Sequence, residues 1–311
     1  MTDNRYYSLN EFLRAKHGEK ILKLSIDAGF TCPNRDGNIS TKGCLFCSER
    51  GSGDFTSYKA GNITKQLEHQ TLLLSKKWGT NRKYIAYFQA FTNTYAPLDI
   101  LKKKYEEALN FPGVVGIAIA TRPDCLSEEV LDYLEELSQR THLWIELGFQ
   151  TMHEDTAQLI NRGYSLACFE DAVMALNKRH IETVAHLILG LPNESKEDIL
   201  ASAKYISKLP LQGIKLHMLH VLDNSPLGNY YKQHPFHLLS QDEYIDLIGN
   251  ILCLLPPNFV IHRLTGDGAR EHLIGPDWTL HKKHVLNSIT HYLKENNIYQ
   301  GKSLNKVVEF N

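Results

Sequence analysis

Three cysteines near the start of the chain are the residues whose type and spacing point most directly to chemistry. Cys32, Cys44 and Cys47 fall within sixteen residues, separated by eleven residues and then by two. The stretch between them is rich in Gly, Asn, Asp and Pro, which favours a loop over a helix or a strand. A loop of this composition can bring three thiolates to one metal centre.

The number of thiolates limits which metal they can hold. A closed structural zinc site needs four protein ligands, and a 4Fe–4S cluster is ordinarily held by four cysteines. No fourth cysteine lies nearby, but the chain has fifteen histidines. The spacing therefore predicts either a cluster with one iron left open for chemistry or a zinc site completed by a distant histidine. Phe46 directly precedes the last cysteine and can cover the face of a cluster.

Length and composition are those of an ordinary globular protein. The 311 residues suit one large domain or two small ones, 42% of them are hydrophobic, and the net charge is −1. There is no apolar run of about 18 residues and no apolar signal core at the N-terminus, so we expect a cytoplasmic protein with no membrane partner. The three cysteines outside the cluster are isolated, which favours free thiols.

Strand-like and helix-like segments alternate along the first two thirds of the chain. Strands are predicted at 20–27, 83–89, 114–120, 142–149, 182–189 and 213–221, and a helix with a Ser8–Glu11 capping box precedes them. The alternation predicts an α/β fold with a parallel sheet and crossover helices. A partial (β/α)6 barrel and an open flavodoxin-like sheet both fit this periodicity.

The pattern changes after Val221, where a turn-rich stretch leads to helices at 241–255 and 280–294 and a short strand at 258–264. We predict a core at 1–222 and a C-terminal extension at 223–311 that packs on the barrel. In the core, ligands should bind at the carboxyl ends of the strands. Polar or turn-forming residues stand at or just after several of these ends: Gln89, Asn93, Thr94, Arg122, Glu146, Gln150, Arg162 and Gly190.

Glu146 lies inside an apolar strand, where an unpaired carboxylate is costly. We predict that it holds a ribose hydroxyl, or that it pairs with Arg122 or Arg162 as a structural ion pair. His217 lies on the sixth strand with Lys215 and His220, a pattern that also fits satisfied polar groups in a core.

Three further features are candidates for binding or catalysis. Arg263, Asp267 and Arg270 surround a late Gly-rich loop, which predicts either a substrate- or phosphate-binding loop or a solvated surface loop. Cys125 follows the third strand and is a candidate catalytic residue. The lysine runs at 102–104 and 282–283 can contact an RNA backbone or form solvated helix faces.

The three cysteines, with an aromatic residue before the last, resemble the radical S-adenosylmethionine (SAM) superfamily. The first gap is longer than the usual C-x3-C-x2-C, and a Gln89–Tyr95 segment stands where the family has a Gly-Gly-Glu motif. The chain is most similar to the YhcC/YtqA-type family. Its Glu146–Gln150 and Asn161–Gly163 segments are also similar to the radical SAM core of the Elongator catalytic subunit.

This resemblance implies a partial TIM-type barrel with a 4Fe–4S cluster on Cys32, Cys44 and Cys47. It implies that SAM is cleaved reductively to a 5′-deoxyadenosyl radical. It places SAM against residues at the strand ends, with Arg122 on its carboxylate and Gly190 beside the adenine. The cofactor-binding residues predicted in this way are Gln89, Asn93, Thr94, Arg122, Glu146, Gln150, Arg162, Gly190 and His217.

The same resemblance implies a substrate and partners. It points to tRNA, at a step that converts a 5-carboxymethylaminomethyl group on a wobble uridine to 5-aminomethyl, and to an electron donor such as a flavodoxin or ferredoxin. Radical chemistry on a small metabolite is one alternative. A zinc-stabilised RNA-binding module without catalysis is another.

Overall fold

The computed structural model describes residues 4–54, 56–57, 61–80 and 82–304, and its strands form one large sheet. Within these residues, seven strands pair side by side in the order β1-β2-β3-β4-β5-β6-β8, and every pairing is parallel. The strands are β1 (Leu22–Ile26), β2 (Tyr84–Phe88), β3 (Val114–Thr121), β4 (His142–Gln150), β5 (Glu182–Leu189), β6 (Gly213–Met218) and β8 (Val260–Arg263).

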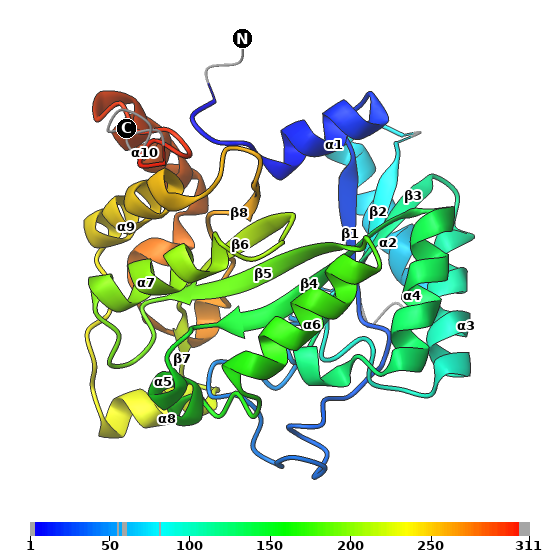
Figure 1. Cartoon of the computed structure of the whole chain (residues 1–311), viewed down its shortest axis with the longest axis horizontal. Helices are drawn as coiled ribbons and strands as arrows, with labels where there is room; N and C mark the ends of the chain where they lie inside the picture. The colour runs from blue at the N-terminus through cyan, green and yellow to red at the C-terminus, as the bar shows by residue number, and fades with distance from the viewer. Residues whose placement is uncertain (1–3, 55, 58–60, 81, 305–311) are drawn as a thin grey trace.

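The strand order decides between the two architectures that periodicity left open. The strands of this sheet lie side by side in chain order from β1 to β8, whereas a flavodoxin-like sheet reverses direction at a switch point. Figure 1 shows the sheet curling, with helices packed on its outer face. The predicted α/β fold with a partial TIM-type barrel is therefore confirmed, and the flavodoxin-like alternative is wrong.

Most helices form a layer on the outer face of the sheet. Within the described residues the helices are α1 (Leu9–His17), α2 (Ile63–Trp78), α3 (Leu98–Leu109), α4 (Glu128–Arg140), α5 (Glu154–Leu159), α6 (Leu166–Lys178), α7 (Lys196–Ile206), α8 (Pro226–Gln233), α9 (Gln241–Leu254) and α10 (Lys282–Glu295). No helix in this part of the chain is long and apolar enough to cross a membrane.

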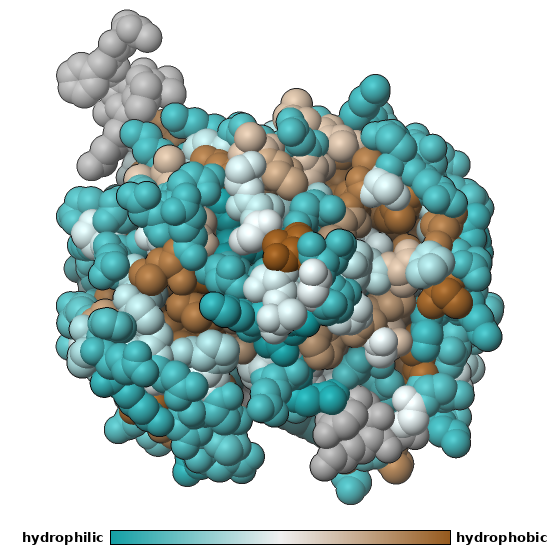
Figure 2. All heavy atoms as spheres, turned by 90° about the horizontal axis from the view of Figure 1, so that it is seen from below, coloured by the Kyte–Doolittle hydropathy of each residue, from teal (hydrophilic) through white to brown (hydrophobic). Residues whose placement is uncertain are grey.

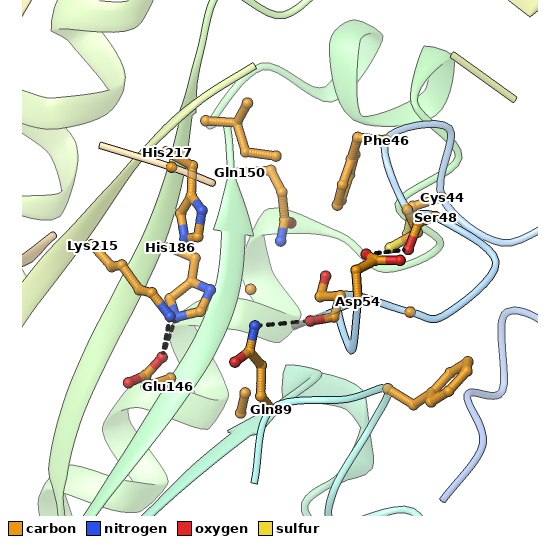
Figure 3. A pocket seen from close by; sticks show the side chains of 18 of the residues that line it. Cys44, Phe46, Ser48, Asp54, Gln89, Glu146, Gln150, His186, Lys215 and His217 are labelled. Atoms are coloured by element: carbon orange, nitrogen blue, oxygen red, sulfur yellow. Dashed lines mark hydrogen bonds and ion pairs between the residues drawn. The ribbon is translucent and has the colours of Figure 1, made fainter. Parts of the chain in front are cut away.

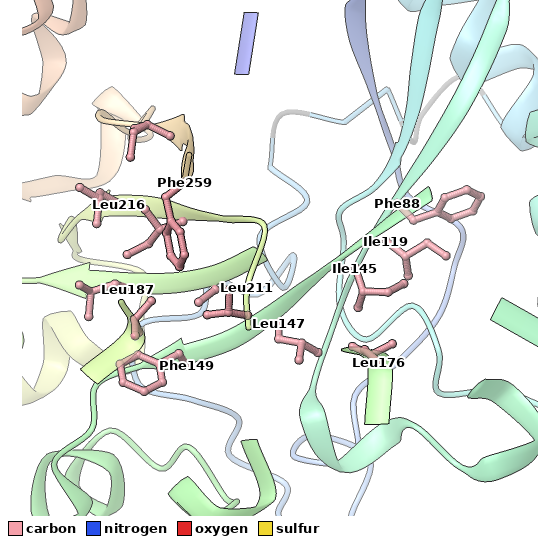
Figure 4. Close-up of a cluster of buried hydrophobic side chains, with 14 of the residues drawn as sticks. Phe88, Ile119, Ile145, Leu147, Phe149, Leu176, Leu187, Leu211, Leu216 and Phe259 are labelled. Atoms are coloured by element: carbon pink, nitrogen blue, oxygen red, sulfur yellow. The ribbon is translucent and has the colours of Figure 1, made fainter. Parts of the chain in front are cut away.

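The alternation of side chains along each strand separates an apolar outer face from an inner face. On β4, Ile145, Leu147 and Phe149 pack into the core beneath the helices, as Figure 4 shows with their neighbours. Burying one such side chain contributes about 1.5–3 kcal/mol, so a one-residue slip in register is strongly disfavoured. Trp144 and Glu146 consequently face the inside of the curled sheet.

Helix α1 packs at the amino-terminal end of the curled sheet. Ser8 and Glu11 form the predicted capping box, which fixes where the helix begins. Leu13 packs with Ile85 and Trp144 in a small apolar cluster on the inner face. This end of the barrel is filled, so the opposite end is the one that is free to bind a ligand.

The C-terminal segment completes the sheet as well as packing on it. Strand β8 pairs with β6, so the sheet has one strand more than the six predicted in the core. The short strands β7 (Val221–Leu222) and β9 (Leu273–Gly275) form a separate antiparallel pair. The division at residue 222 stays a prediction.

Candidate functional site

A cavity of about 280 Å³ lies at the carboxyl ends of the strands. Figure 3 shows two of its walls. One wall comes from the loop between β1 and α2, and it carries Cys44, Phe46, Ser48 and Asp54. The other comes from the inner face of the sheet. We call it the polar wall, and it consists of Tyr87, Glu146, His186, Lys215 and His217.

The three predicted metal-binding cysteines lie together on the first wall. Cys32, Cys44 and Cys47 all line the cavity and are partly exposed to it. Hydrogen bonding between two of these thiols lowers the pKa of Cys44 to about 7 and raises the pKa of Cys47. A thiolate is the form that binds metal.

A cluster and a single ion place different demands on these three thiols. In a 4Fe–4S cluster each cysteine binds a different iron, whereas a zinc ion draws its ligands to within about 2.3 Å of one point. In the described part of the chain, no group of three or more His, Cys, Asp or Glu side chains is arranged to hold a single metal ion. The three thiols nevertheless face one cavity, which suits the corners of a larger cluster.

Two asparagines tie the cysteine loop to the segment that follows α5. The fully buried Asn34 donates to the backbone oxygen of Asn161 at 2.7 Å, and its amide nitrogen is 3.4 Å from the Cys44 sulfur. Asn161 donates in return to the backbone oxygen of Gly43 at 2.7 Å. The Asn161–Gly163 segment singled out in the sequence therefore supports the loop that carries the cysteines.

Arg35 holds the end of the same loop. Its guanidinium donates to the backbone oxygens of Cys47 at 3.3 Å and Glu49 at 3.0 Å. Gly43 has a φ of +71°, and a Cβ there would come within 2.8 Å of the Arg35 Nε. Glycine at this position is needed both for the backbone conformation and for the approach of the arginine.

Arg122 lines the cavity beside the cysteines, as expected for a residue that binds an anionic group. It forms a two-point ion pair with Asp124 at 2.9 and 2.7 Å and donates to the backbone oxygen of Arg162 at 2.9 Å. Its guanidinium lies 4.7 Å from the ring centre of Tyr164. The group is rigidly held before any ligand binds.

Two predicted glutamines also line the cavity. Gln89 donates to the backbone oxygen of Ser52 at 2.8 Å, which joins the end of β2 to the cysteine loop. Gln150 has a φ of +61°, and its side-chain oxygen accepts from the Tyr164 hydroxyl at 2.8 Å. Figure 3 shows both amides in the space between the two walls.

Several predicted cofactor-binding residues lie away from the cavity lining. The Asn93 amide donates to the backbone oxygens of Phe88 and Ala120, and the Thr94 hydroxyl contacts Thr121. Arg162 is almost fully buried, and Gly190 lies at the turn after β5 with a φ of +90°. None of these four predicted residues is among the described cavity-lining residues, and their contacts fit a structural role.

The predicted ion pair of Glu146 with Arg122 or Arg162 is wrong, whereas its contact with a ribose hydroxyl stays a prediction. Arg122 pairs with Asp124, and Arg162 pairs with Glu154. Both arginines belong to segments beyond the strand ends, whereas Glu146 points to the inner face of the sheet. It meets side chains that point inward from four other strands and from its own: Lys23, Tyr87, Trp144, His186 and Lys215.

The polar wall holds one buried carboxylate among several donors. Glu146 accepts from Lys215, Tyr87 and His186 at 2.8 Å each. Burial opposes its ionisation, yet the charges of Lys215 and Lys23 hold the pKa of Glu146 well below its usual range. Alanines on β3 stand between β2 and β4, which leaves room for the Tyr87 hydroxyl to reach the carboxylate.

Lowered pKa values favour the neutral forms of the histidines in the polar wall. Burial, together with the charge of Lys215, lowers the pKa of His186 to about 4. Burial and the neighbouring His186 hold the pKa of His217 well below its usual range, and the two rings lie 4.9 Å apart. Burial also lowers the pKa of Lys215 to about 7, although Glu146 acts in the opposite direction.

Of the predicted substrate-binding and catalytic residues, some line the cavity and others lie outside it. Arg263 and Asp267 line the cavity and pair with each other at 3.1 Å, whereas Arg270 is outside the described lining. Cys125 is also outside it, and burial raises the pKa of its thiol, which does not favour a nucleophile.

Sequence reasoning missed several side chains of the cavity, among them Tyr87, Tyr164 and His186. Tyr87 and His186 each stand between two apolar residues of a strand. A polar side chain in such a position was the available signal that it faces the inside of the barrel. Tyr164 follows the Asn161–Gly163 segment by one residue, but nothing in the sequence indicates that it reaches Gln150.

Comparison with known proteins places these features in one family. Residues 34–206 match the family model of the radical SAM superfamily, and residues 211–295 match the radical SAM C-terminal domain. The YtqA protein of Bacillus subtilis is 45% identical over 308 residues, which are 99% of this chain and 95% of that protein. Protein YhcC of Escherichia coli is 33% identical over 94% of each chain.

More distant similarity reaches the Elongator proteins. Elongator complex protein 3 of Dictyostelium discoideum is 30% identical over 168 residues, which are 53% of this chain and 29% of that protein. The solved structure of Methanocaldococcus infernus Elp3 superposes with a TM-score of 0.67 at 16% identity, covering 90% of this chain and 64% of that chain. The structural match shows a shared fold.

The cysteine loop and the parallel half-barrel are the features expected of the family that the comparisons match. The matches cover nearly the whole chain. A 4Fe–4S cluster and SAM are the cofactors of the superfamily that the family model describes. The chain belongs to the radical SAM superfamily, within the family of YhcC and YtqA.

Proposed function

We propose that this radical SAM enzyme modifies the wobble uridine of tRNA, at a step that converts a 5-carboxymethylaminomethyl group to 5-aminomethyl. The observation that carries the proposal is a single cavity with the three cysteines on one wall and the polar wall facing them. Such a cavity brings the cluster-binding thiols and the polar wall to one site. The choice of tRNA rests on the resemblance to the Elongator-type radical SAM core.

The residues of the first wall suit the two cofactors. Cys32, Cys44 and Cys47 would hold the cluster, and Gln89 and Arg122 would bind polar groups of SAM. When bound, the cluster and SAM supply one-electron chemistry that the side chains of the protein lack. The protein would orient SAM and exclude water. Asp124 fixes the Arg122 guanidinium, and the N–H groups that Asp124 and the Arg162 oxygen leave free would bind the SAM carboxylate.

The surface around this end of the barrel is compatible with an RNA partner. Figure 2 shows a largely hydrophilic face on which apolar side chains form small, separate groups. Lys282, in one of the predicted basic runs, pairs at 2.8 Å with Asp267, a cavity-lining residue. The run at 282–283 therefore lies next to the cavity, where phosphate contacts would position a nucleotide.

The proposal includes a cytoplasmic location and an electron donor such as a flavodoxin or ferredoxin, because a tRNA substrate and one-electron chemistry require them. The most direct test is nucleoside mass spectrometry of tRNA from a strain that lacks this gene. We expect 5-carboxymethylaminomethyluridine to accumulate and its aminomethyl derivatives to disappear.

Complementation sharpens this experiment. The wild-type gene and a Cys168→Ala control should restore the normal profile, because Cys168 lies on α6 outside the motif. A Cys44→Ala variant should not restore it. An unchanged wobble-uridine profile in the deletion strain would exclude the tRNA step and favour radical chemistry on a small metabolite.

A further inference from the structure

The polar wall and the residues next to it carry more positive charge than their carboxylates balance. Glu146 faces two lysines, Lys215 at 2.8 Å and Lys23 at 3.3 Å. Asp267 likewise faces two cations, Arg263 at 3.1 Å and Lys282 at 2.8 Å. Among these paired groups, four cations therefore face two carboxylates. An anionic ligand at this end of the cavity would be favoured.

Polar groups of the cavity-lining residues are also left without a full set of partners. The Lys215 ammonium has three donors, and it directs two of them to the Tyr87 hydroxyl at 2.7 Å and to Glu146 at 2.8 Å. The Nε2 atoms of His217 and His220 are buried and have no hydrogen-bond partner among the described residues. A buried polar atom without a partner is costly, so a ligand that supplies acceptors would relieve that cost.

A glycine-rich loop shapes this end of the cavity. Gly266 and Gly268 pack directly against the ring of His220, and a Cβ at these positions would lie 2.7 and 2.5 Å from it. Larger residues would displace the ring from the cavity lining. The loop thus fits closely around a histidine whose buried Nε2 atom bonds to no described residue.

We propose that Lys215 and His217 bind a carboxylate group of the substrate. This inference rests on the proposed function and specifies it further. A 5-carboxymethylaminomethyl group ends in a carboxylate, whereas the aminomethyl product ends in a cationic amine. The substrate carries this carboxylate in addition to an ammonium, whereas the product keeps only an ammonium. The excess positive charge around Glu146 would attract the carboxylate and repel the product, so the same residues would favour substrate binding and product release.

The carboxylate is favoured over an RNA phosphate as the anion because of where these groups lie. Lys215 is 4% exposed and its ammonium sits among side chains of the barrel interior. A slender terminal group can reach this depth, whereas a phosphodiester carries sugars on both sides. Phosphate contacts belong at the rim, where Lys282 is nearly half exposed.

Binding of three free nucleosides tests the proposal. The cluster-loaded full-length enzyme is titrated, with SAM and without reductant, with 5-carboxymethylaminomethyluridine, its primary amide and 5-aminomethyluridine. We expect the wild-type enzyme to bind the carboxylate at least tenfold more tightly than the amide, and the aminomethyl nucleoside more weakly still. Lys215→Met should abolish the preference for the carboxylate over the amide, and Lys215→Arg should retain part of it.

A second variant covers the case in which Lys215→Met does not fold. His217→Asn keeps the charge of the wall and should reduce the preference several-fold. Equal binding of carboxylate and amide by the wild-type enzyme, no binding of the carboxylate form, or an undiminished preference in both variants would overturn the inference.

The outcomes separate this inference from the proposed function. A deletion strain with the altered tRNA profile, together with no carboxylate preference, would remove the carboxylate site alone. An unchanged tRNA profile, together with a clear carboxylate preference that Lys215→Met abolishes, would remove the tRNA step and leave a site for an acidic substrate.

Discussion

Glu146 illustrates how a single residue organises the interior of this barrel. Its carboxylate is fully buried, yet it accepts hydrogen bonds from several strands at once. The sequence predicted that such a carboxylate must have partners, because an unpaired one is costly. It did not identify them, because they come from strands distant in sequence that meet only when the sheet curls.

The stability of the fold should depend on this carboxylate. Glu146→Gln leaves Lys215 and Lys23 without their common counter-charge, and breaking a buried pair costs about 3–5 kcal/mol. We expect that loss in the free energy of unfolding from urea titration at pH 7. Glu106→Gln is the matched control, because Glu106 pairs with the exposed Arg140. It should cost less than about 1 kcal/mol, and similar losses in both variants would contradict this role.

Lys215 should make carboxylate binding depend on pH. Burial lowers its pKa to about 7, so the ammonium is mostly present at pH 6 and mostly deprotonated at pH 8. Histidines next to it have lowered pKa values and stay neutral over this range. The other titratable and charged groups that face it are Glu146, Tyr87, Lys23 and Arg263.

The protonated fraction of Lys215 should fall by about tenfold between pH 6 and pH 8. The affinity for 5-carboxymethylaminomethyluridine should therefore fall by the same factor. Lys215→Arg should remove most of that dependence, because an arginine stays charged. Titration of both proteins at several pH values checks this. A flat profile in the wild-type enzyme would mean that Lys215 does not bind the carboxylate.

At the scale of elements, the cysteine loop depends on a segment that lies far along the chain. The sequence predicted the loop from its composition and singled out Asn161–Gly163 by resemblance. It could not show that Asn34 and Asn161 link the two segments by hydrogen bonds, since no local pattern encodes an interaction between distant loops. The seventh strand, β8, was missed from the sheet for the same reason.

The hydrogen bonds between these loops should help the protein keep its cluster. Asn161→Gly preserves the positive φ of 51° but removes the bond to the Gly43 oxygen. Loss of a hydrogen bond worth about 1 kcal/mol corresponds to about fivefold faster iron release to a chelator. Asn193→Gly is the control, because Asn193 is exposed and also has a positive φ. Equal release rates in the two variants would rule out this support.

For the whole molecule, the alternation of strands and helices was enough to predict a parallel sheet, and the strand order then selected the curled form. The cavity could be predicted only in part. Residues at strand ends were visible in the sequence, but the polar wall depends on which face each strand residue takes. The C-terminal segment also contributes to the cavity through Arg263 and Asp267, so one end of the site is built late in the chain.

The basic run beside the cavity should contribute to tRNA affinity. Replacing Lys282 and Lys283 with alanine should weaken tRNA binding. The slope of log affinity against log salt concentration should also become shallower, by about one for each phosphate that is no longer neutralised. Lys178→Ala is the control, because Lys178 ends α6 just before β5 begins, away from the carboxyl ends of the strands. Filter binding across a salt series would show the difference, and equal slopes in all three proteins would refute this role.

Anaerobic reconstitution with iron and sulfide tests most directly whether the three cysteines hold a cluster that SAM completes. The wild-type protein should bind about four iron atoms per chain, and SAM should change the electron paramagnetic resonance spectrum of the reduced cluster. Cys44→Ala should lose both properties, while Cys168→Ala should keep them. A colourless protein with one zinc, or a cluster whose spectrum does not change when SAM is added, would contradict the assignment of a SAM-binding cluster to these cysteines.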